Sequence, residues 1–175
     1  MTIIPFDALV AVPWKNGLGI TRELAVEPHG ASMEDFAWRV SIADVDTASP
    51  FSVFPGIDRT IVLLDGAGFT MVLDGDREHA LTTPCVPFAF PGEARVDVRL
   101  AGGATRDFNL MVRRGVATAR LDVLQGPGVF ADIALVHIAR GTAEADGAAL
   151  AQGDTALDTR RLVLPPGTQA VAITL

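Results

Sequence analysis

The chain of 175 residues has few of the features that mark secreted or membrane-spanning proteins. Its single cysteine, Cys85, cannot form an internal disulfide, which agrees with a reducing cytoplasm and predicts a small buried residue. Gly, Pro or a charge interrupts every apolar run well before the roughly 18 residues that a membrane-spanning helix needs, so no membrane span is expected. The first residues also lack the basic and apolar segments of a secretory leader. We therefore expect a cytoplasmic protein.

Positive charge is scarce as well. The chain has 14 Lys and Arg against 21 Asp and Glu, a net charge of −7, and its only lysine is Lys15. The basic residues are scattered, whereas binding to a phosphate backbone requires a concentrated positive field, so nucleic acid is not an expected partner. The preference for arginine suits bidentate binding of carboxylates, but it can equally reflect a GC-rich genome.

Patterns typical of metal, cofactor and nucleophile sites are missing. The three histidines, His29, His79 and His137, are isolated and form no His-x-His pair, whereas a divalent metal ion needs three or four convergent ligands. His137 lies in an apolar segment and is expected to be a hydrogen-bonded core residue. The Gly-x-Gly segments are not followed by helices, no Gly-x-Ser-x-Gly elbow occurs, and Cys85 has no nearby base. We expect no metal and no cofactor.

The chain is instead rich in turn residues and short apolar segments. Its 17 Gly and 11 Pro leave little room for helices of ten or more residues. Alternating apolar residues at 38–42, 95–100 and 169–175 predict strands buried on one face. Continuous apolar runs at 61–64 and 133–136 predict strands buried between two sheets. Together these patterns predict an all-β sandwich or barrel.

An internal repeat suggests how the strands are organised. Shifting the chain by 75 positions sets residues 61–66 over 136–141, a strand followed by a turn and Gly, and sets Pro91-Gly92 with its following strand over Pro166-Gly167. The match predicts two similar β units within one compact chain. We expect the first half to span about residues 1–114 and the second about 115–175.

Four clusters of aromatic and polar residues in the first half are candidates for a site. The segment 14–23 combines an indole, an amide, two glycines and three charges, although a Gly-rich hairpin facing water would look the same. In 38–42, alternation places Arg39 and Ser41 on one face, either in a barrel mouth or in solvent. In 106–111 it places Asp107 and Asn109 together, where they could orient Arg39 or Arg59 or form an ordinary ion pair.

These motifs, in this order, closely resemble those of the HutD/Ves family. The resemblance rests on 14–24, 38–43, 51–59, 64–66 and 107–111, and it covers roughly residues 5–115. It implies an all-β bicupin, with two cupin-like β-barrels or jelly-roll units in one chain. The resemblance is also compatible with a homodimer. By position, it implies that a pocket is lined by Trp14, Asn16, Thr21, Glu23, Arg39, Ser41, Phe51, Ser52, Arg59, Asp107 and Asn109.

The resemblance also implies a function, because HutD proteins are encoded with enzymes of histidine degradation and are regarded as small-molecule-binding and regulatory. The leading hypothesis is a non-enzymatic protein that binds a small carboxylated metabolite, such as formylglutamate or urocanate, with Arg59 and Arg39 as anion anchors. The alternative is a metal-free isomerase or hydrolase that uses Glu23 or Asp107 as a general base beside Arg59. A third reading is a structural role, in which the chain's own side chains fill the barrel mouth.

Overall fold

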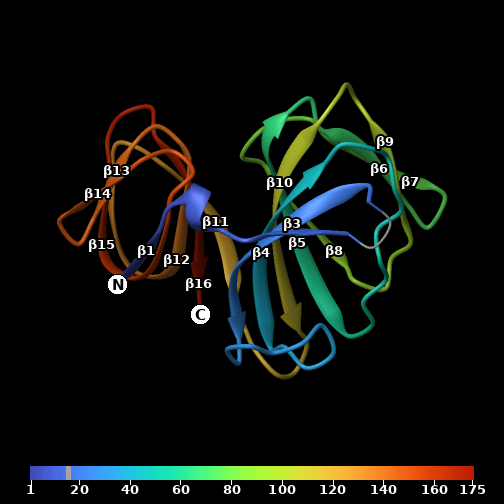
Figure 1. The fold of residues 1–175 in the computed structure, drawn as a ribbon, viewed down its shortest axis with the longest axis horizontal. Helices are drawn as coiled ribbons and strands as arrows, with labels where there is room; N and C mark the ends of the chain where they lie inside the picture. The colour runs from blue at the N-terminus through green and yellow to red at the C-terminus, as the bar shows by residue number, and fades with distance from the viewer. Residues whose placement is uncertain (15–16) are drawn as a thin grey trace. The chain divides into compact units, whose positions relative to one another are not determined.

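The computed structural model describes residues 1–14 and 17–175 and is built almost entirely of strands (Figure 1). The strands in this part of the chain are β1 (Thr2–Ile4), β2 (Ala11–Pro13), β3 (Gly19–Glu27), β4 (Trp38–Val45), β5 (Ile57–Gly66), β6 (Phe69–Leu73), β7 (Arg77–Leu81), β8 (Pro87–Pro91), β9 (Val96–Leu100), β10 (Thr105–Arg113), β11 (Arg120–Gln125), β12 (Gly128–Arg140), β13 (Ala143–Ala145), β14 (Ala148–Leu150), β15 (Thr155–Leu164) and β16 (Gln169–Thr174). One short 3₁₀ helix covers Phe6–Ala8. The all-β prediction is confirmed, and every expected strand overlaps an observed one.

The strands divide between two compact units. One unit, here called the pocket unit, comprises Val10–Thr118, and the other, the C-terminal unit, comprises Ala119–Leu175 together with Met1–Leu9. The division falls close to the boundary expected at 114, but the first nine residues lie with the second half of the chain. They do so because β1 pairs antiparallel with β15, with Ile3 opposite Ala156. No helix in the described ranges is long and apolar enough to cross a membrane.

In the pocket unit a larger sheet packs against a smaller one. The larger sheet has the strand order β2-β3-β4-β10-β5-β8 and the smaller the order β7-β6-β9, and all of their pairings are antiparallel. Alternation places Ile61 and Leu63 of the larger sheet against Phe69, Met71 and Val98 of the smaller. Their burial removes a large apolar area from water, so it holds the two sheets together.

The C-terminal unit has a sheet of order β11-β16-β12-β15-β13-β14, with β1 added beside β15. Its core is made of small and aliphatic side chains such as Ile138, Leu162 and Ala170. His137 is buried here and its Nδ1 lies 3.0 Å from the hydroxyl of Thr155, as expected for a core histidine. Along the described residues, no sheet closes on itself by strand pairing, so the expected barrels are open sheets.

The 75-residue shift matches strands but not their partners. It sets β5 over β12 and β9 over β16. However, β12 pairs directly with β16, whereas β9 pairs with β6, and β5 pairs with β10 and β8. By hydrogen-bonding pattern, the counterpart of β16 is therefore not β9. Apolar alternation alone could not distinguish these two strands, because both present the same period.

Candidate functional site

The candidate site is set by the strand register of the larger sheet in the pocket unit. Met111 on β10 lies opposite Arg39 on β4 and also opposite Arg59 on β5. Two residues along, Asn109 lies opposite Ser41. Because residues directly opposite each other point to the same face, the two arginines share one face about 10 Å apart at their Cα atoms, two ladder spacings.

This face carries a cavity of about 600 Å³. Alternate residues of the central strands form its wall, and the β2–β3 hairpin, the segment between β3 and β4 and the loop between β4 and β5 contribute the rest. The lining residues are Pro13, Trp14, Thr21, Met33, Arg39, Ser41, Ala43, Val45, Ser49, Pro50, Phe51, Ser52, Phe54, Arg59, Asp107, Asn109 and Met111. The volume falls within the range typical of small-molecule sites, and the lining combines apolar side chains with polar and charged ones.

Arg59 is the buried cation of this cavity, with only 9% of its surface exposed. Its guanidinium carbon lies 5.2 Å, 5.4 Å and 4.9 Å from the ring centroids of Phe51, Phe54 and Phe90, within the range of cation–π attraction. Its terminal nitrogens donate long hydrogen bonds, both of 3.5 Å, to the carbonyl oxygen of Ser52 and to Oδ1 of Asn109. Its Nε is buried without a partner. Burial lowers the pKa of Arg59 to about 10, so the side chain stays cationic at neutral pH.

Asp107 lies in the same wall and is 1% exposed. Its Oδ1 accepts a short hydrogen bond from Nδ2 of Asn109, while its Oδ2 is buried without a partner. Burial raises the pKa of Asp107 to about 7, although the Asn109 bond and the charge of Arg59 both oppose this rise. The expected ion pair with Arg39 or Arg59 does not form within 4.0 Å. Instead, Asn109 connects Asp107 to Arg59 through its two amide atoms.

Arg39 is the second cation of the cavity and is already paired. Its Nε donates a hydrogen bond of 2.8 Å to Oε2 of Glu23, and one terminal nitrogen donates to Oγ of Ser41 at 3.4 Å. The side chain of Arg39 is 15% exposed and that of Glu23 is 45% exposed. Glu23 itself does not line the cavity, so its place is at the rim, holding Arg39.

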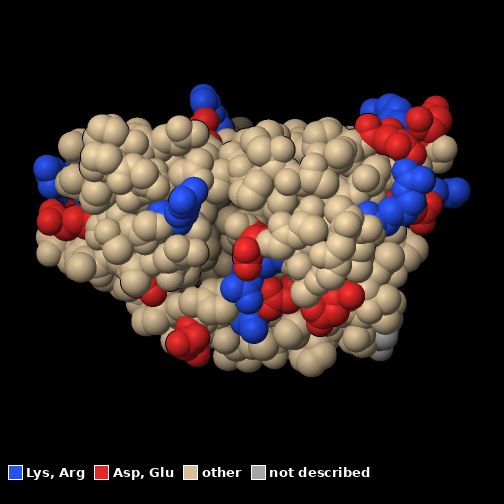
Figure 2. Space-filling view, turned by 90° about the horizontal axis from the view of Figure 1, so that it is seen from above, with Lys and Arg blue, Asp and Glu red and all other residues tan. Residues whose placement is uncertain are grey.

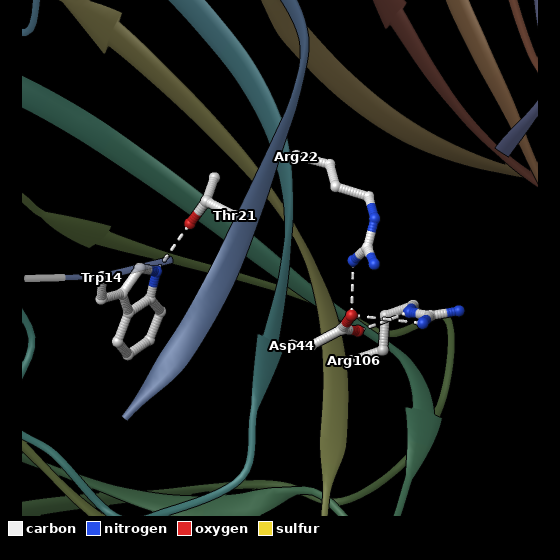
Figure 3. Close-up of polar contacts among 5 residues, drawn as sticks. All are labelled: Trp14, Thr21, Arg22, Asp44 and Arg106. Atoms are coloured by element: carbon white, nitrogen blue, oxygen red, sulfur yellow. Dashed lines mark hydrogen bonds and ion pairs between the residues drawn. The ribbon is translucent and has the colours of Figure 1, made fainter. Parts of the chain in front are cut away.

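Trp14 and Thr21 close one side of the cavity in the β2–β3 hairpin. The indole Nε1 donates a hydrogen bond of 2.7 Å to Oγ1 of Thr21 (Figure 3). The ring packs over Gly19, where a Cβ would lie 3.0 Å from the indole and 2.7 Å from the carbonyl oxygen of Asp44. Gly19 is therefore needed because the indole and a neighbouring strand approach its backbone closely. The described part of segment 14–23 is therefore a hairpin, and its residues Trp14 and Thr21 also line the cavity, so the two expectations for this segment are compatible.

The opposite face of the same strands carries a separate charge cluster. Figure 3 shows Arg22 pointing away from Thr21 toward Asp44, which also binds Nε of Arg106 at 2.6 Å. Burial alone would raise the pKa of Asp44, but hydrogen bonds from Arg106 and Arg22 outweigh it and hold the pKa below its usual value. Because residues 21 and 22 alternate across the strand, this cluster fixes the sheet without entering the cavity.

The structure brings most of the expected site residues together. Those that line the cavity are Trp14, Thr21, Arg39, Ser41, Phe51, Ser52, Arg59, Asp107 and Asn109. Asn16 lies outside the described residues. Sequence reasoning missed the other lining residues, which are Pro13, Met33, Ala43, Val45, Ser49, Pro50, Phe54 and Met111. Alternation from Asp107 and Asn109 would have found Met111, whereas Met33 and Pro50 lie in irregular segments without a periodic signal. In the described ranges, no group of three His, Cys, Asp or Glu side chains converges as a metal site would require.

Comparison with known proteins gives these residues a family context. The HutD family model matches residues 7–174. A Pseudomonas putida protein described as an uncharacterised 21.2 kDa protein in the hutC 3' region is 42% identical over 115 residues, 66% of this chain and 60% of that protein. This chain therefore spans less than two thirds of that relative's length.

Solved structures agree with this match. HutD from Pseudomonas fluorescens SBW25, determined in a formate condition, has a TM-score of 0.85 at 32% identity, covering 99% of this chain and 97% of that one. Protein YlbA from E. coli, at 11% identity, has a TM-score of 0.73 over 98% of this chain and 88% of its own, and shares the fold alone. The names of the two Pseudomonas relatives associate them with histidine-utilisation genes. On the match over residues 7–174, this all-β, cupin-like chain belongs to the HutD family.

Proposed function

We propose that the protein binds a small carboxylated metabolite in the cavity of the pocket unit and acts as a regulatory sensor in histidine utilisation. The observation that carries the proposal is Arg59, a guanidinium that is 9% exposed, lines the cavity and has a buried Nε without a partner. A buried cation with an unpaired hydrogen-bond donor destabilises the folded protein unless an anion binds to it. A carboxylate has the planar, two-oxygen geometry that an arginine fork binds well.

Formylglutamate and urocanate are the proposed ligands, because the relatives of this chain are named for histidine-utilisation genes. One carboxylate would bind Arg59 at the buried end. Arg39 lies in the same cross-strand row, where it could bind the second carboxylate of formylglutamate. Trp14 and Phe51 supply flat apolar walls on the same cavity. A site of this kind selects ligands by charge at its ends and by shape between them.

Isothermal titration calorimetry with N-formyl-L-glutamate and with urocanate tests the proposal. We expect heat of binding for the wild-type protein and a loss of at least tenfold in affinity for Arg59→Ala, because a charge-assisted bidentate contact is worth about 1.5–3 kcal/mol. Arg99→Ala is the matched control, since Arg99 is 62% exposed and pairs with Glu78 on the smaller sheet. The proposal is wrong if neither compound binds at millimolar concentration.

A second candidate function is metal-free catalysis with Asp107 as general base. The observation that favours it is the pKa of about 7, which suits proton transfer at neutral pH, in a carboxylate near Arg59. Glu23 is a weaker candidate, because it lies at the rim and is bonded to Arg39. Turnover of a bound compound that disappears in Asp107→Asn while binding persists would favour this function over a sensor.

A further inference from the structure

The described charged groups in the cavity are unequally neutralised. Arg39 is in direct contact with Glu23, at 2.8 Å. Arg59 has Asp107 as its opposite charge, but the two side chains do not meet within 4.0 Å, and Asn109 lies between them as a hydrogen-bonded link. Arg59 is therefore the cation that can accept a new anion without first breaking an ion pair.

Asp107 is placed to carry a proton on one particular atom. Its Oδ1 already accepts from Asn109, whereas its Oδ2 is buried and has no partner. A proton on Oδ2 would break no hydrogen bond. In the ionised carboxylate, by contrast, Oδ2 carries negative charge without contact to water or to a hydrogen-bond donor. The neutral and ionised forms are closely balanced at neutral pH, because burial raises the pKa of Asp107 to about 7.

Other described charged groups near Asp107 are already held in ion pairs, with the exception of Arg59. Asp44, on the opposite face of β4, adds to the rise in the pKa of Asp107, but its own carboxylate is held by Arg22 and Arg106. At the rim, β3 and β4 contribute Glu23 and Arg39, which neutralise each other. Arg59 on β5 is the group whose positive charge keeps the pKa of Asp107 from rising further.

We infer that Asp107 takes up a proton from solvent when a ligand carboxylate binds Arg59, so that the site binds its ligand together with that proton. The ligand anion neutralises the positive charge of Arg59, which stabilises ionised Asp107 in the free protein. It also places a negative charge near Asp107. Both effects favour the O–H form at Oδ2. This inference rests on the proposed function and gives that site a dependence on cellular pH, with binding weakened as the pH rises above neutrality.

Calorimetry with N-formyl-L-glutamate tests the coupling, because this probe has no group that titrates between pH 6 and 9, unlike the imidazole of urocanate. Titrations at pH 7.5 in buffers of different ionisation enthalpy measure the protons taken up. With Asp107 at a pKa of about 7 in the free protein, we expect uptake of roughly three quarters of a proton per ligand. Across pH, the Kd should be constant below about pH 6 and rise about tenfold per unit above about pH 7.5.

Asp107→Asn separates this role from a structural one, since the amide mimics the protonated carboxyl in shape and charge. We expect the variant to bind with a Kd that does not change from pH 6 to 9 and with no proton uptake. Asp76→Asn, in the exposed turn between β6 and β7, should keep the wild-type slope. If Asp107→Asn does not fold, the buffer series on the wild-type protein decides alone.

The outcomes distinguish the two proposals. Binding of the probe with no proton uptake and a constant Kd overturns the coupling and leaves the carboxylate site standing. Retention of the wild-type slope in a folded Asp107→Asn protein assigns the proton to another group and also overturns it. Failure of both N-formyl-L-glutamate and urocanate to bind at millimolar concentration overturns the proposed function and the coupling together.

Discussion

At the scale of single residues, the burial of Asp107 has a consequence for stability as well as for binding. Its pKa rises from 3.8 in the unfolded chain to about 7 in the folded protein. The folded state therefore holds a proton that the unfolded state releases between these values. The resulting contribution to stability is fully present below about pH 4 and is lost as the pH rises through about 7.

We expect this group to lower the free energy of unfolding by up to about 4 kcal/mol between pH 4 and pH 8, and Asp107→Asn to remove that slope. The variant should therefore become more stable relative to the wild type as the pH rises, whatever the substitution costs at pH 4. Urea unfolding of both proteins at half-unit pH intervals measures the difference. A stability difference that stays constant from pH 4 to pH 8 would contradict the raised pKa.

Site residues could be predicted from sequence where they lie on regular strands. Arg39 and Ser41, and likewise Asp107 and Asn109, alternate with apolar neighbours, so a period of two placed each pair on one face. Glu23 lies opposite Ser41, as alternation predicts, but its carboxylate binds Arg39 and does not line the cavity. The hydrogen bond from Arg59 to Oδ1 of Asn109 could not be predicted, since it joins two strands whose register the sequence does not state.

At the scale of elements, the loop between β4 and β5 shows what periodicity cannot predict. The backbone N–H of Phe51 donates to the carbonyl oxygen of Val96 at 2.9 Å, and that of Phe54 donates to Gly92 at 2.7 Å. Gly92 permits this because a Cβ there would lie 2.3 Å from the carbonyl oxygen of Phe54. The loop is thus anchored at two points, which places both phenyl rings against Arg59. The sequence showed an aromatic cluster, but these distant backbone partners carry no local signal.

The β2–β3 hairpin offers a prediction at the same scale. Gly19→Ala would place a methyl group in contact with the indole of Trp14 and the carbonyl oxygen of Asp44. We expect a loss of about 1–3 kcal/mol in the free energy of unfolding and weaker binding of the carboxylate probe, because the indole wall must shift. Urea unfolding and calorimetry measure the two effects.

Gly102→Ala is the matched control for that substitution. Its new methyl group would lie 3.6 Å from the Cβ of Ala67, an ordinary contact. We expect its stability to stay within about 0.5 kcal/mol of the wild type. If Gly19→Ala and Gly102→Ala have equal effects, the position of the Trp14 indole does not require a glycine at residue 19.

At the scale of the whole chain, charge is distributed in pairs. Figure 2 shows one face on which most Lys and Arg lie beside Asp or Glu, without an extended basic surface. Several exposed arginines have acidic partners, as in the pairs Arg77–Asp74, Arg99–Glu78 and Arg114–Asp58. Exposed pairs of this kind contribute little to stability and leave no dense positive field. The proposed anion site therefore depends on buried arginine and not on the charge of the surface.

The two units are not consecutive halves of the chain, because residues 1–9 belong to the C-terminal unit. The sequence could predict only part of this division. Composition and the repeat placed a division near residue 114, because the polar clusters end there. The transfer of β1 to the C-terminal unit could not be predicted, since the partners of Thr2 and Ile3 lie more than 150 residues away, at Leu157 and Ala156. Pairings over such separations have no local pattern in the chain.

This arrangement predicts that stability and binding can be changed separately. Ile3 is half-buried and packs against the core of the C-terminal unit, whereas every described residue that lines the cavity lies between Pro13 and Met111 in the pocket unit. We expect Ile3→Ala to lower the free energy of unfolding of the C-terminal unit by about 1–2 kcal/mol and to leave the Kd of the carboxylate probe within twofold.

Hydrogen exchange and calorimetry on the same samples measure the two quantities. Val129→Ala, at a position that is 62% exposed on β12, serves as the control and should change neither. A loss of binding in Ile3→Ala comparable to the loss of stability would show that the first strand supports the site as well as its own sheet. Because β1 pairs with β15 inside the C-terminal unit, we expect the two effects to remain separate.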